Sequence, residues 1–423
     1  MYYPRELENK INKYLDKPEI IAVKGPRQAG KTTLLKKIYN CLVKKKKCLF
    51  LSFEDREKLA VFEEDIKSFK QLYIDKNEVV FLDEFQYAEK GGQKLKYLFD
   101  TTNTKFIISG SSSLELVGKT GKYLVGRMFS FELLPFSFQE FINVVNPKLK
   151  KLLQQNTKQV KKLLSFETTK LADKESLQSE SIKKKLNKTL ETYILWGGYP
   201  RVILAEDKEE RKEVLKNILD TYLLRDIKDL LNLATDRQLV GLAKFLSLQI
   251  GNPVVYKELS NSANLNYKQV KNHLQILEET YITNKIRPFF RNKRTELVKN
   301  PKLFFLDTGL RNQLINDFSN LKLRSDKGSL MENYVCCQLK KLGFPLKFWR
   351  TKSQAEVDFI IEKGNSLLPI EVKSNLINFK VGKSLYSFIK KYSPKTALVI
   401  NQNLWGKKKI NNTLLYYLPG YYL

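Results

Sequence analysis

The chain has 423 residues, 42% of them apolar and 12% aromatic, enough for hydrophobic cores in two to four domains of the usual size of about 150 residues. Its 75 Lys and Arg against 45 Asp and Glu give a net charge of +30, which favours polyanionic partners such as nucleic acid; a lysine-rich composition from an AT-rich genome is the competing interpretation. No apolar run approaches the roughly 18 residues of a membrane span, no signal-peptide core opens the chain, and the cysteines lack zinc or disulfide spacing. We therefore expect a cytoplasmic protein that does not contact membranes. The single histidine, His273, excludes Ser-His-Asp and His-based metal chemistry, so catalysis must depend on carboxylates, lysines, hydroxyls and a hard cation.

Residues 1–145 alternate apolar strands with amphipathic helices, which predicts an α/β fold around a parallel sheet. The expected strands are Ile20–Lys24, Lys47–Phe53, Val79–Asp83 and Lys105–Ser109.

A glycine-rich turn follows the first expected strand. Residues 25–32, GPRQAGKT, match G-x-x-x-x-G-K-[ST], and a helical pattern follows them. In such a loop, backbone N–H groups and the helix N-terminus bind phosphates, the lysine reaches the β- and γ-phosphates, and the hydroxyl ligates Mg²⁺. We predict that ATP and Mg²⁺ bind here, with Lys31 on the phosphates and Thr32 on the metal. The predicted nucleotide-binding residues are Gly25, Gln28, Ala29, Gly30, Lys31, Thr32 and Thr33.

Two adjacent carboxylates end the third expected strand, at the edge of the sheet where doubly wound folds bind ligands. Asp83 is the candidate Mg²⁺ ligand, and Glu84 is the candidate that orients the attacking water. The next strand ends in the sequence SGSSS, residues 109–113. Ser111 is the candidate residue that senses the γ-phosphate; the alternative is that these serines only complete a surface loop.

These two motifs, the strand ending ISGSSS, the segment Leu124–Phe141 and the later WGGYPR together resemble a prokaryotic family of AAA-type P-loop ATPases. The resemblance implies a winged helix and a restriction-endonuclease-like domain after the ATPase core. It also implies that Arg127 contacts the γ-phosphate, in cis or in a neighbouring subunit of a homo-oligomer; a structural ion pair is the alternative.

Residues 146–190 are rich in lysine and poor in aromatics, which predicts a helical insertion or linker on the surface. Residues 191–250 read as a helical, lid-like region.

Residues 251–314 contain the candidate DNA-binding region. A short helix, a turn at Ala263–Asn266 and a second helix are expected, with Val270, Leu274 and Leu277 facing inward. Tyr281–Lys299 reads as a basic hairpin, which together with the helix pair is typical of a winged helix-turn-helix. His273 is expected on the surface. The outward cations and amides would be Lys268, Gln269, Lys271, Asn272 and Gln275, and the hairpin adds Lys285, Arg287, Arg291, Lys293 and Arg294.

Residues 315–423 carry acids on two expected strands joined by a turn at Lys363–Asn365. Asp358 precedes Glu371-Val372-Lys373, and strand alternation puts Glu371 and Lys373 on one face. The segment resembles the PD-(D/E)XK nuclease arrangement, without the proline. By that resemblance Asp358 and Glu371 bind Mg²⁺, Lys373 acts at the water, and Glu332 on the preceding helix adds a third acid.

Three functions follow. The first is an Mg²⁺-dependent ATPase that binds DNA and cleaves it with its last domain. The second is an ATP-switched DNA-binding or scaffold protein without nuclease activity. The third is a STAND-like signalling ATPase with a protein partner, which would be favoured if the basic hairpin side chains pointed into the protein.

Overall fold

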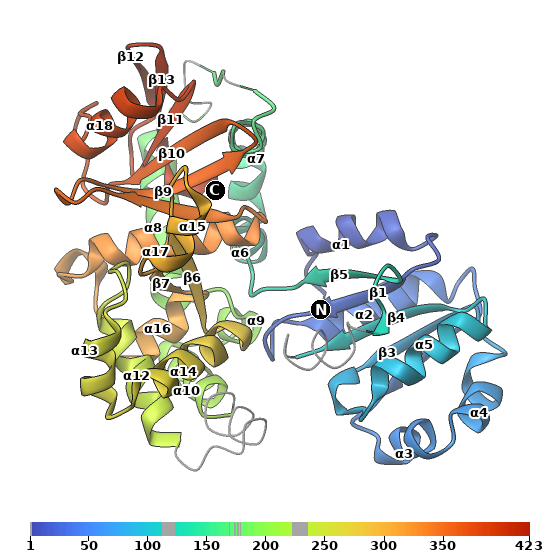
Figure 1. Ribbon diagram of the computed structural model, residues 1–423. Helices are drawn as coiled ribbons and strands as arrows, with labels where there is room; N and C mark the ends of the chain where they lie inside the picture. The colour runs from blue at the N-terminus through green and yellow to red at the C-terminus, as the bar shows by residue number, and fades with distance from the viewer. Residues whose placement is uncertain are drawn as a thin grey trace. The chain divides into compact units, whose positions relative to one another are not determined.

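A computed structural model describes residues 2–111, 123–168, 170–172, 175, 177, 179–221 and 236–423 (Figure 1). The chain divides into two compact units. Unit 1 contains Met1–Phe136 and Glu279–Tyr281, and unit 2 contains Ser137–Glu278 and Ile282–Leu423. In the part of the chain that the structure describes, no helix is long and apolar enough to cross a membrane.

Unit 1 is a parallel sheet with helices on both faces. Successive side chains of a strand point to opposite faces, so Ile20 and Ala22 of the first strand enter one hydrophobic cluster and Ile21 and Val23 the other. All pairings in the sheet are parallel, in the order β2-β3-β4-β1-β5. The strands are β1 Ile20–Lys24, β2 Cys48–Ser52, β3 Val79–Asp83, β4 Lys105–Gly110 and β5 Met128–Glu132; the helices are α1 Glu6–Ile11, α2 Lys31–Leu42, α3 Arg56–Glu64, α4 Ile66–Phe69 and α5 Gly91–Thr101.

The four strands expected from the sequence are confirmed within one or two residues at each end. The fifth strand, β5, was not expected, because it lies in a segment whose alternation is weak: its side chains are at most partly buried.

Unit 2 contains an eight-stranded mixed sheet in the order β12-β13-β11-β10-β9-β8-β6-β7. Its strands are β6 Thr283–Pro288, β7 Lys302–Phe305, β8 Leu346–Arg350, β9 Glu356–Lys363, β10 Ser366–Val372, β11 Thr396–Asn401, β12 Gly406–Ile410 and β13 Thr413–Pro419. Its helices are α6 Phe138–Val145, α7 Pro147–Leu164, α8 Glu180–Trp196, α9 Pro200–Ile203, α10 Lys208–Leu219, α12 Asp236–Leu248, α13 Tyr256–Ala263, α14 Tyr267–Glu279, α15 Lys293–Val298, α16 Thr308–Leu314, α17 Lys327–Lys341 and α18 Lys383–Tyr392.

The domain boundary that the sequence predicted between residues 314 and 315 separates two strands of this sheet from the other six. Arg287 and Pro288 of β6 pair in parallel with Lys347 and Phe348 of β8, and β7 pairs with β6. The sheet of the carboxyl domain therefore begins within the region assigned to the winged helix, and residues 315–423 lack two of its strands.

Residues 146–190 are not a solvated linker. The helix α7 buries one face, including Leu153 and Val160, and further along, the Leu171 N–H donates to the Tyr416 hydroxyl at 3.0 Å. The hydroxyls of Tyr421 and Tyr422 donate to the Glu175 carboxylate at 3.1 and 2.7 Å. The lysines of the segment occupy its exposed face, and its leucines pack against the carboxyl end of the chain.

The segment WGGYPR is explained by a backbone contact. Gly197 has φ +76°, and a Cβ there would lie 2.0 Å from Asp307 Oδ1. The Asp307 carboxylate accepts hydrogen bonds from the N–H groups of Gly198 (2.7 Å) and Leu310 (3.1 Å). The backbone at Gly309 approaches α8 just as closely, since a Cβ at this position would lie 2.1 Å from the Trp196 carbonyl oxygen. The two glycines therefore let α16 dock directly on the end of α8.

Candidate functional site

The phosphate loop connects β1 to α2 in the conformation that its glycines require. A Cβ at Gly25 would lie 2.0 Å from the Leu133 carbonyl oxygen, and Gly30, the N-cap of α2, has φ +94°. The Lys31 ammonium is buried and donates to the carbonyls of Gly25 and Pro26, both at 3.0 Å. Burial lowers the pKa of Lys31 to about 8, although the charges of Glu84 and Asp83 oppose that shift. A bound anion would therefore stabilise the charged form of Lys31, which burial disfavours.

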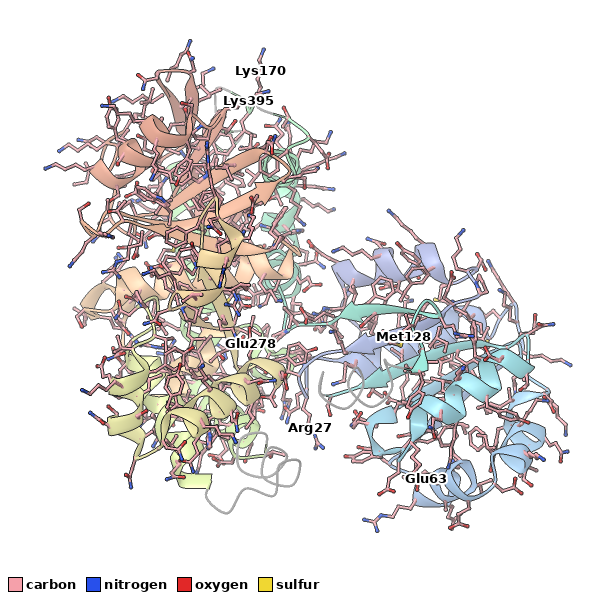
Figure 2. The ribbon with its side chains drawn as sticks, in the orientation of Figure 1. Arg27, Glu63, Met128, Lys170, Glu278 and Lys395 are labelled. Atoms are coloured by element: carbon pink, nitrogen blue, oxygen red, sulfur yellow. The ribbon has the colours of Figure 1, made fainter. Side chains whose placement is uncertain are left out.

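Around the loop, Thr32 is half-buried and Thr33 is exposed, and Gln28 adopts a left-handed conformation with φ +60°. Ala29 is buried. Arg27 lies at the exposed side of the loop and donates from Nη2 to the Tyr87 hydroxyl at 3.1 Å (Figure 2).

The two acids that end β3 lie beside Lys31, as predicted. Asp83 is buried and contacts the Ser109 hydroxyl of the neighbouring strand, while Glu84 has φ +53° and its N–H donates to the same hydroxyl at 3.3 Å. The charges of both carboxylates act on the Lys31 ammonium. Asp83, Thr32 and the loop present hard oxygen donors, a set that suits Mg²⁺.

Gln86 was missed by sequence reasoning. Its side-chain amide donates to a Glu84 carboxylate oxygen, and its Oε1 accepts from the Ser111 N–H at 3.2 Å. Ser111, the candidate γ-phosphate sensor, is thus linked through Gln86 to the carboxylate assigned to the water. The rest of the serine cluster, Ser112 and Ser113, lies outside the described residues.

Arg5 was also missed. It lies before α1, and its guanidinium donates to the Ala29 carbonyl (2.8 Å, Nη1) and to the Leu134 carbonyl (2.5 Å, Nη2). The same group stacks on Phe136, with Cζ 4.6 Å from the ring centroid. A lone arginine before a helix gives no sequence signal for this role, because its partners are backbone carbonyls 24 and 129 residues away.

Arg127 does not lie at the phosphate loop of its own chain. It precedes β5, which starts opposite Ile20 at the beginning of β1, whereas the loop follows the other end of β1. Its Nε forms an ion pair with Asp100 at 3.0 Å. The assignment of Arg127 to the γ-phosphate in cis is therefore wrong, because the parallel register puts it at the opposite edge of the sheet; a role in trans stays a prediction.

The helix pair α13–α14 forms with its turn where predicted. Asn264, with φ +51°, ends α13. Val270, Leu274 and Leu277 are buried. Every member of the expected outward set is exposed: Lys268, Gln269, Lys271, Asn272 and Gln275. His273 is a correction, since it is buried rather than on the surface, and its Nδ1 lies 2.7 Å from the Gln269 carbonyl oxygen.

The basic hairpin differs from the prediction. The helix α15 separates β6 from β7, so the second strand comes after Lys299. Several of its cations point to protein partners: Lys285 pairs with Glu278 at 2.6 Å (Glu278 is labelled in Figure 2), and Lys293 with Glu362 at 2.9 Å. Arg291 lies over the Tyr392 ring, whereas Arg294 is exposed.

A groove of about 310 Å³ runs between α14 and this hairpin. Tyr267 is exposed at its rim, next to Tyr256, and the Lys271 ammonium lies 4.4 Å from the Tyr267 ring centroid. Among the described residues that line the groove there is no Asp or Glu. Its cations are Lys271, Lys285, Arg287 and Lys299.

In the carboxyl part of unit 2, β9 and β10 form the expected hairpin, and Gly364 in its turn has φ +58°. Asp358 Oδ2 accepts the Val372 N–H at 2.7 Å, and Lys373 Nζ lies 2.8 Å from Glu371 Oε1. Burial raises the pKa of Asp358, with the Glu371 charge adding to that shift. Glu371 Oε2 is buried and has no hydrogen-bond partner among the described residues. Asp358, Glu371 and Lys373 are thus brought together, as predicted.

Glu332 has a lysine neighbour in addition to the predicted acid Asp358. Lys302 of β7, almost fully buried, puts its ammonium 3.5 Å from Glu332 Oε1 and in contact with Glu356. Burial and the Asp358 charge raise the pKa of Glu332, and Lys302 partly offsets them. Within the described ranges, no three His, Cys, Asp or Glu side chains are arranged as a metal-binding group. The third acid is therefore compensated by a lysine that sequence reasoning did not include.

Three family models match successive parts of the chain. Residues 17–142 match a model described as an AAA domain, while residues 187–321 and 327–419 match two models described as domains of unknown function, DUF8612 and DUF4143. With its parallel sheet, phosphate loop and paired acids, the first part of the chain is an AAA-type P-loop domain.

The relatives of the whole chain carry no assigned activity. An uncharacterized protein of Haemophilus influenzae is 26% identical over 378 residues, covering 86% of this chain and 84% of that protein. An uncharacterized protein of Methanocaldococcus jannaschii is 26% identical, covering 81% and 72%. Among solved structures, the Aeropyrum pernix ORC2 protein in its ADP form aligns at 12% identity and TM-score 0.33, over 75% of this chain and 97% of that one. AMPPCP-bound DnaA from Aquifex aeolicus aligns at 16% identity and TM-score 0.25, over 65% and 86%.

Proposed function

We propose that this protein hydrolyses ATP with Mg²⁺ in unit 1 and binds DNA through unit 2. The observation that carries the ATPase is the convergence of Lys31, Asp83 and Glu84 at one edge of the sheet. Lys31 would leave the carbonyls of Gly25 and Pro26 for the phosphates, since the phosphates offer it a full negative charge in place of two dipoles. Glu84 would orient the water. Thr32 and Asp83 would hold Mg²⁺, which neutralises charge on the β- and γ-phosphates when bound.

The ATPase is tested with two variants. Lys31→Ala should abolish nucleotide binding, and Glu84→Gln should retain ATP but stop its hydrolysis, because it keeps the shape of the side chain and loses the charge that orients the water. Equal turnover in Glu84→Gln and wild type would refute the assignment of Glu84.

DNA binding is supported by the exposed polar face of α14 and by the cationic groove beside it. Together α13, α14 and the β6–β7 hairpin would act as a winged helix, with α14 contacting base edges and phosphates. Because Lys285 and Lys293 pair with the carboxylates of Glu278 and Glu362, we assign the phosphate contacts mainly to Lys268 and Lys271 of α14. Wild type should bind duplex DNA with an affinity that falls steeply with salt.

The carboxyl domain is proposed as nuclease-like, with Asp358 and Glu371 as the pair that would hold one hard cation and Lys373 as the residue beside the scissile phosphate. The unpartnered Glu371 Oε2 supports this assignment. Bound Mg²⁺ or Mn²⁺ would activate a water and stabilise charge on the phosphate. Cleavage of DNA by wild type, and its loss in Lys373→Ala, would test this step.

Two alternative functions remain as candidates. If wild type does not cleave DNA, the favoured function is that of an ATP-switched DNA-binding protein. A signalling ATPase is the third candidate, favoured by the hairpin cations that point to protein partners.

A further inference from the structure

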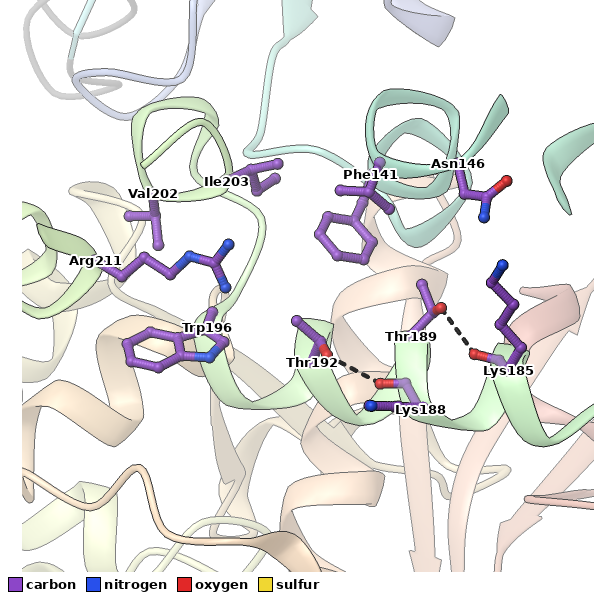
Figure 3. A pocket seen from close by; sticks show the side chains of 11 residues that line it. Phe141, Asn146, Lys185, Lys188, Thr189, Thr192, Trp196, Val202, Ile203 and Arg211 are labelled. Carbon is purple, nitrogen blue, oxygen red and sulfur yellow. Dashed lines mark hydrogen bonds between the residues drawn. The ribbon is translucent and has the colours of Figure 1, made fainter. Parts of the chain in front are cut away.

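A second cavity, of about 340 Å³, lies in unit 2 among α6, α8, α9 and α10 (Figure 3). Its apolar wall consists of buried side chains: Phe141, Trp196, Val202 and Ile203. Trp196 is fixed from outside the cavity, because Phe318 stacks on it with ring centroids 4.5 Å apart and planes 12° apart. The phosphate loop, the α13–α14 pair and the carboxylates of the last domain contribute no side chain to this wall.

The charged side chains described in the lining of this cavity are all cations. Lys185 and Lys188 are exposed at its edge on α8, and Arg211 extends from α10 over Trp196, with Cζ 5.7 Å from the ring centroid (Figure 3). The side-chain Oδ1 of Asn146 already accepts the Leu149 N–H at 3.1 Å, which leaves the side-chain NH2 group for a ligand. No Asp or Glu is found among the described residues that line the cavity.

Two threonines add hydroxyl oxygens to the lining. The Thr189 and Thr192 hydroxyls donate to the carbonyls of Lys185 and Lys188, at 2.8 and 2.9 Å (dashed in Figure 3). Their protons are used within α8, so these side chains line the cavity without offering it a proton. The attraction of the cavity for anions therefore comes from Lys185, Lys188 and Arg211, and not from its threonines.

One donor is left without a partner. Arg211 Nε is buried and has no hydrogen bond to the described residues. A buried N–H without an acceptor has lost its hydrogen bonds to water and gained none in the protein, so such a group in a native structure calls for an explanation. The anionic group of a bound molecule would supply an acceptor, because the Arg211 side chain belongs to the lining of the cavity.

We propose that this cavity binds a small organic anion, with an apolar body against Phe141 and Trp196 and a carboxylate or phosphate group on Arg211 and Lys188. The guanidinium would bind the anionic group with two parallel hydrogen bonds, the geometry that arginine favours for both kinds of oxyanion. The site is independent of the phosphate loop and of the proposed DNA contacts.

The full chain would be titrated by isothermal calorimetry with hexanoate, and with two matched probes that each lack one feature. We expect hexanoate to bind at least about tenfold more tightly than 1-hexanol, which lacks the charge, or acetate, which lacks the body. Phenyl phosphate, titrated in parallel, distinguishes a phosphate ligand from a carboxylate ligand. Equal affinity for hexanoate and 1-hexanol, or no binding of hexanoate or phenyl phosphate at millimolar concentration, would overturn the proposal.

Variants locate the binding. Arg211→Leu should weaken hexanoate binding about tenfold or more, and Lys188→Met, an exposed change that does not disturb the core, should weaken it several-fold. Lys212→Met, on the same helix but outside the cavity, is the matched control and should bind as wild type does. Hexanoate should also change the tryptophan fluorescence of wild type and not that of Trp196→Phe, which keeps the other two tryptophans. Unchanged affinity in both Arg211→Leu and Lys188→Met would put the anion elsewhere and refute the site.

Discussion

The Ser111 N–H donates a hydrogen bond to Gln86 Oε1 at 3.2 Å, and the amide group of the same glutamine contacts the Glu84 carboxylate. One side chain therefore connects the end of β4 to the acid assigned to the attacking water. Because Gln86 uses both ends of its amide, a change at Ser111 on nucleotide binding would be transmitted to Glu84.

Gln86→Leu removes both hydrogen bonds at similar side-chain volume. We expect nucleotide affinity within about twofold of wild type and ATP turnover reduced about tenfold or more, since Glu84 loses the group that orients it. Steady-state turnover and nucleotide titration measure the two effects separately. Gln93→Leu, on an exposed face of α5, is the control. Wild-type turnover in Gln86→Leu would contradict this role.

Arg5→Met removes two hydrogen bonds to backbone carbonyls, one of them in the phosphate loop. We expect the affinity for ATP to fall about tenfold, and the free energy of unfolding of unit 1 to fall by about 1–3 kcal/mol, because the carbonyls of Ala29 and Leu134 lose a charged donor. Nucleotide titration and thermal unfolding measure the change. Arg56→Met, an exposed arginine on α3, should alter neither. Normal ATP affinity in Arg5→Met would show that the loop holds its shape unaided.

The salt dependence of DNA binding should identify the cations that meet phosphates. Replacing Lys268 and Lys271 with Ala should lower the slope of log K against log salt by roughly one unit per lost contact. Replacing Lys285 and Lys293 should lower it less, because Glu278 and Glu362 already neutralise them. Fluorescence anisotropy at several salt concentrations gives the slopes, with the exposed Lys408 and Lys409 of β12 as controls. A larger effect of replacing Lys285 and Lys293 would assign the DNA contact to the hairpin instead.

The carboxylate pair of the last domain predicts a metal-dependent stability. In a Lys31→Ala background, which lacks nucleotide binding, millimolar Mn²⁺ should raise the melting temperature, since the cation binds the folded state. Asp358→Ala should abolish that rise. The full chain is needed, because a fragment of residues 315–423 would lack β6 and β7. If Mn²⁺ has no effect on the Lys31→Ala protein, the site is charge-compensated by Lys302 and Lys373 alone, and the nuclease assignment fails.

Gly309→Ala should destabilise unit 2 strongly. Its Cβ would lie 2.1 Å from the Trp196 carbonyl oxygen, so α16 must move away from α8 and the hydrogen bond between Gly198 and Asp307 is lost. We expect a loss of about 3 kcal/mol or more, measured by urea unfolding. Gly241→Ala in α12 is the matched control: its Cβ meets nothing within 4 Å, and alanine favours a helix, so stability should stay the same or rise.

The sequence by itself determined the features that depend on local pattern. The phosphate loop, the acids after β3, the hairpin with Asp358 and Glu371, and the buried face of α14 each rest on residues close together in the chain, where hydrophobic periodicity and turn chemistry decide the structure. For those features the structure agrees with the expectation. Their roles in catalysis and in DNA binding stay predictions.

The tertiary structure decided everything that depends on distant partners. Arg5 reaches carbonyls 24 and 129 residues away, and Lys302 comes from a different strand to face Glu332. The parallel register moved Arg127 to the far edge of the sheet, and packing converted the lysine-rich α7 from an expected linker into part of a core. The sequence pattern specifies which face of an element is apolar, and not which other element will cover that face, because the partner is selected by the shape and charge of the assembled chain.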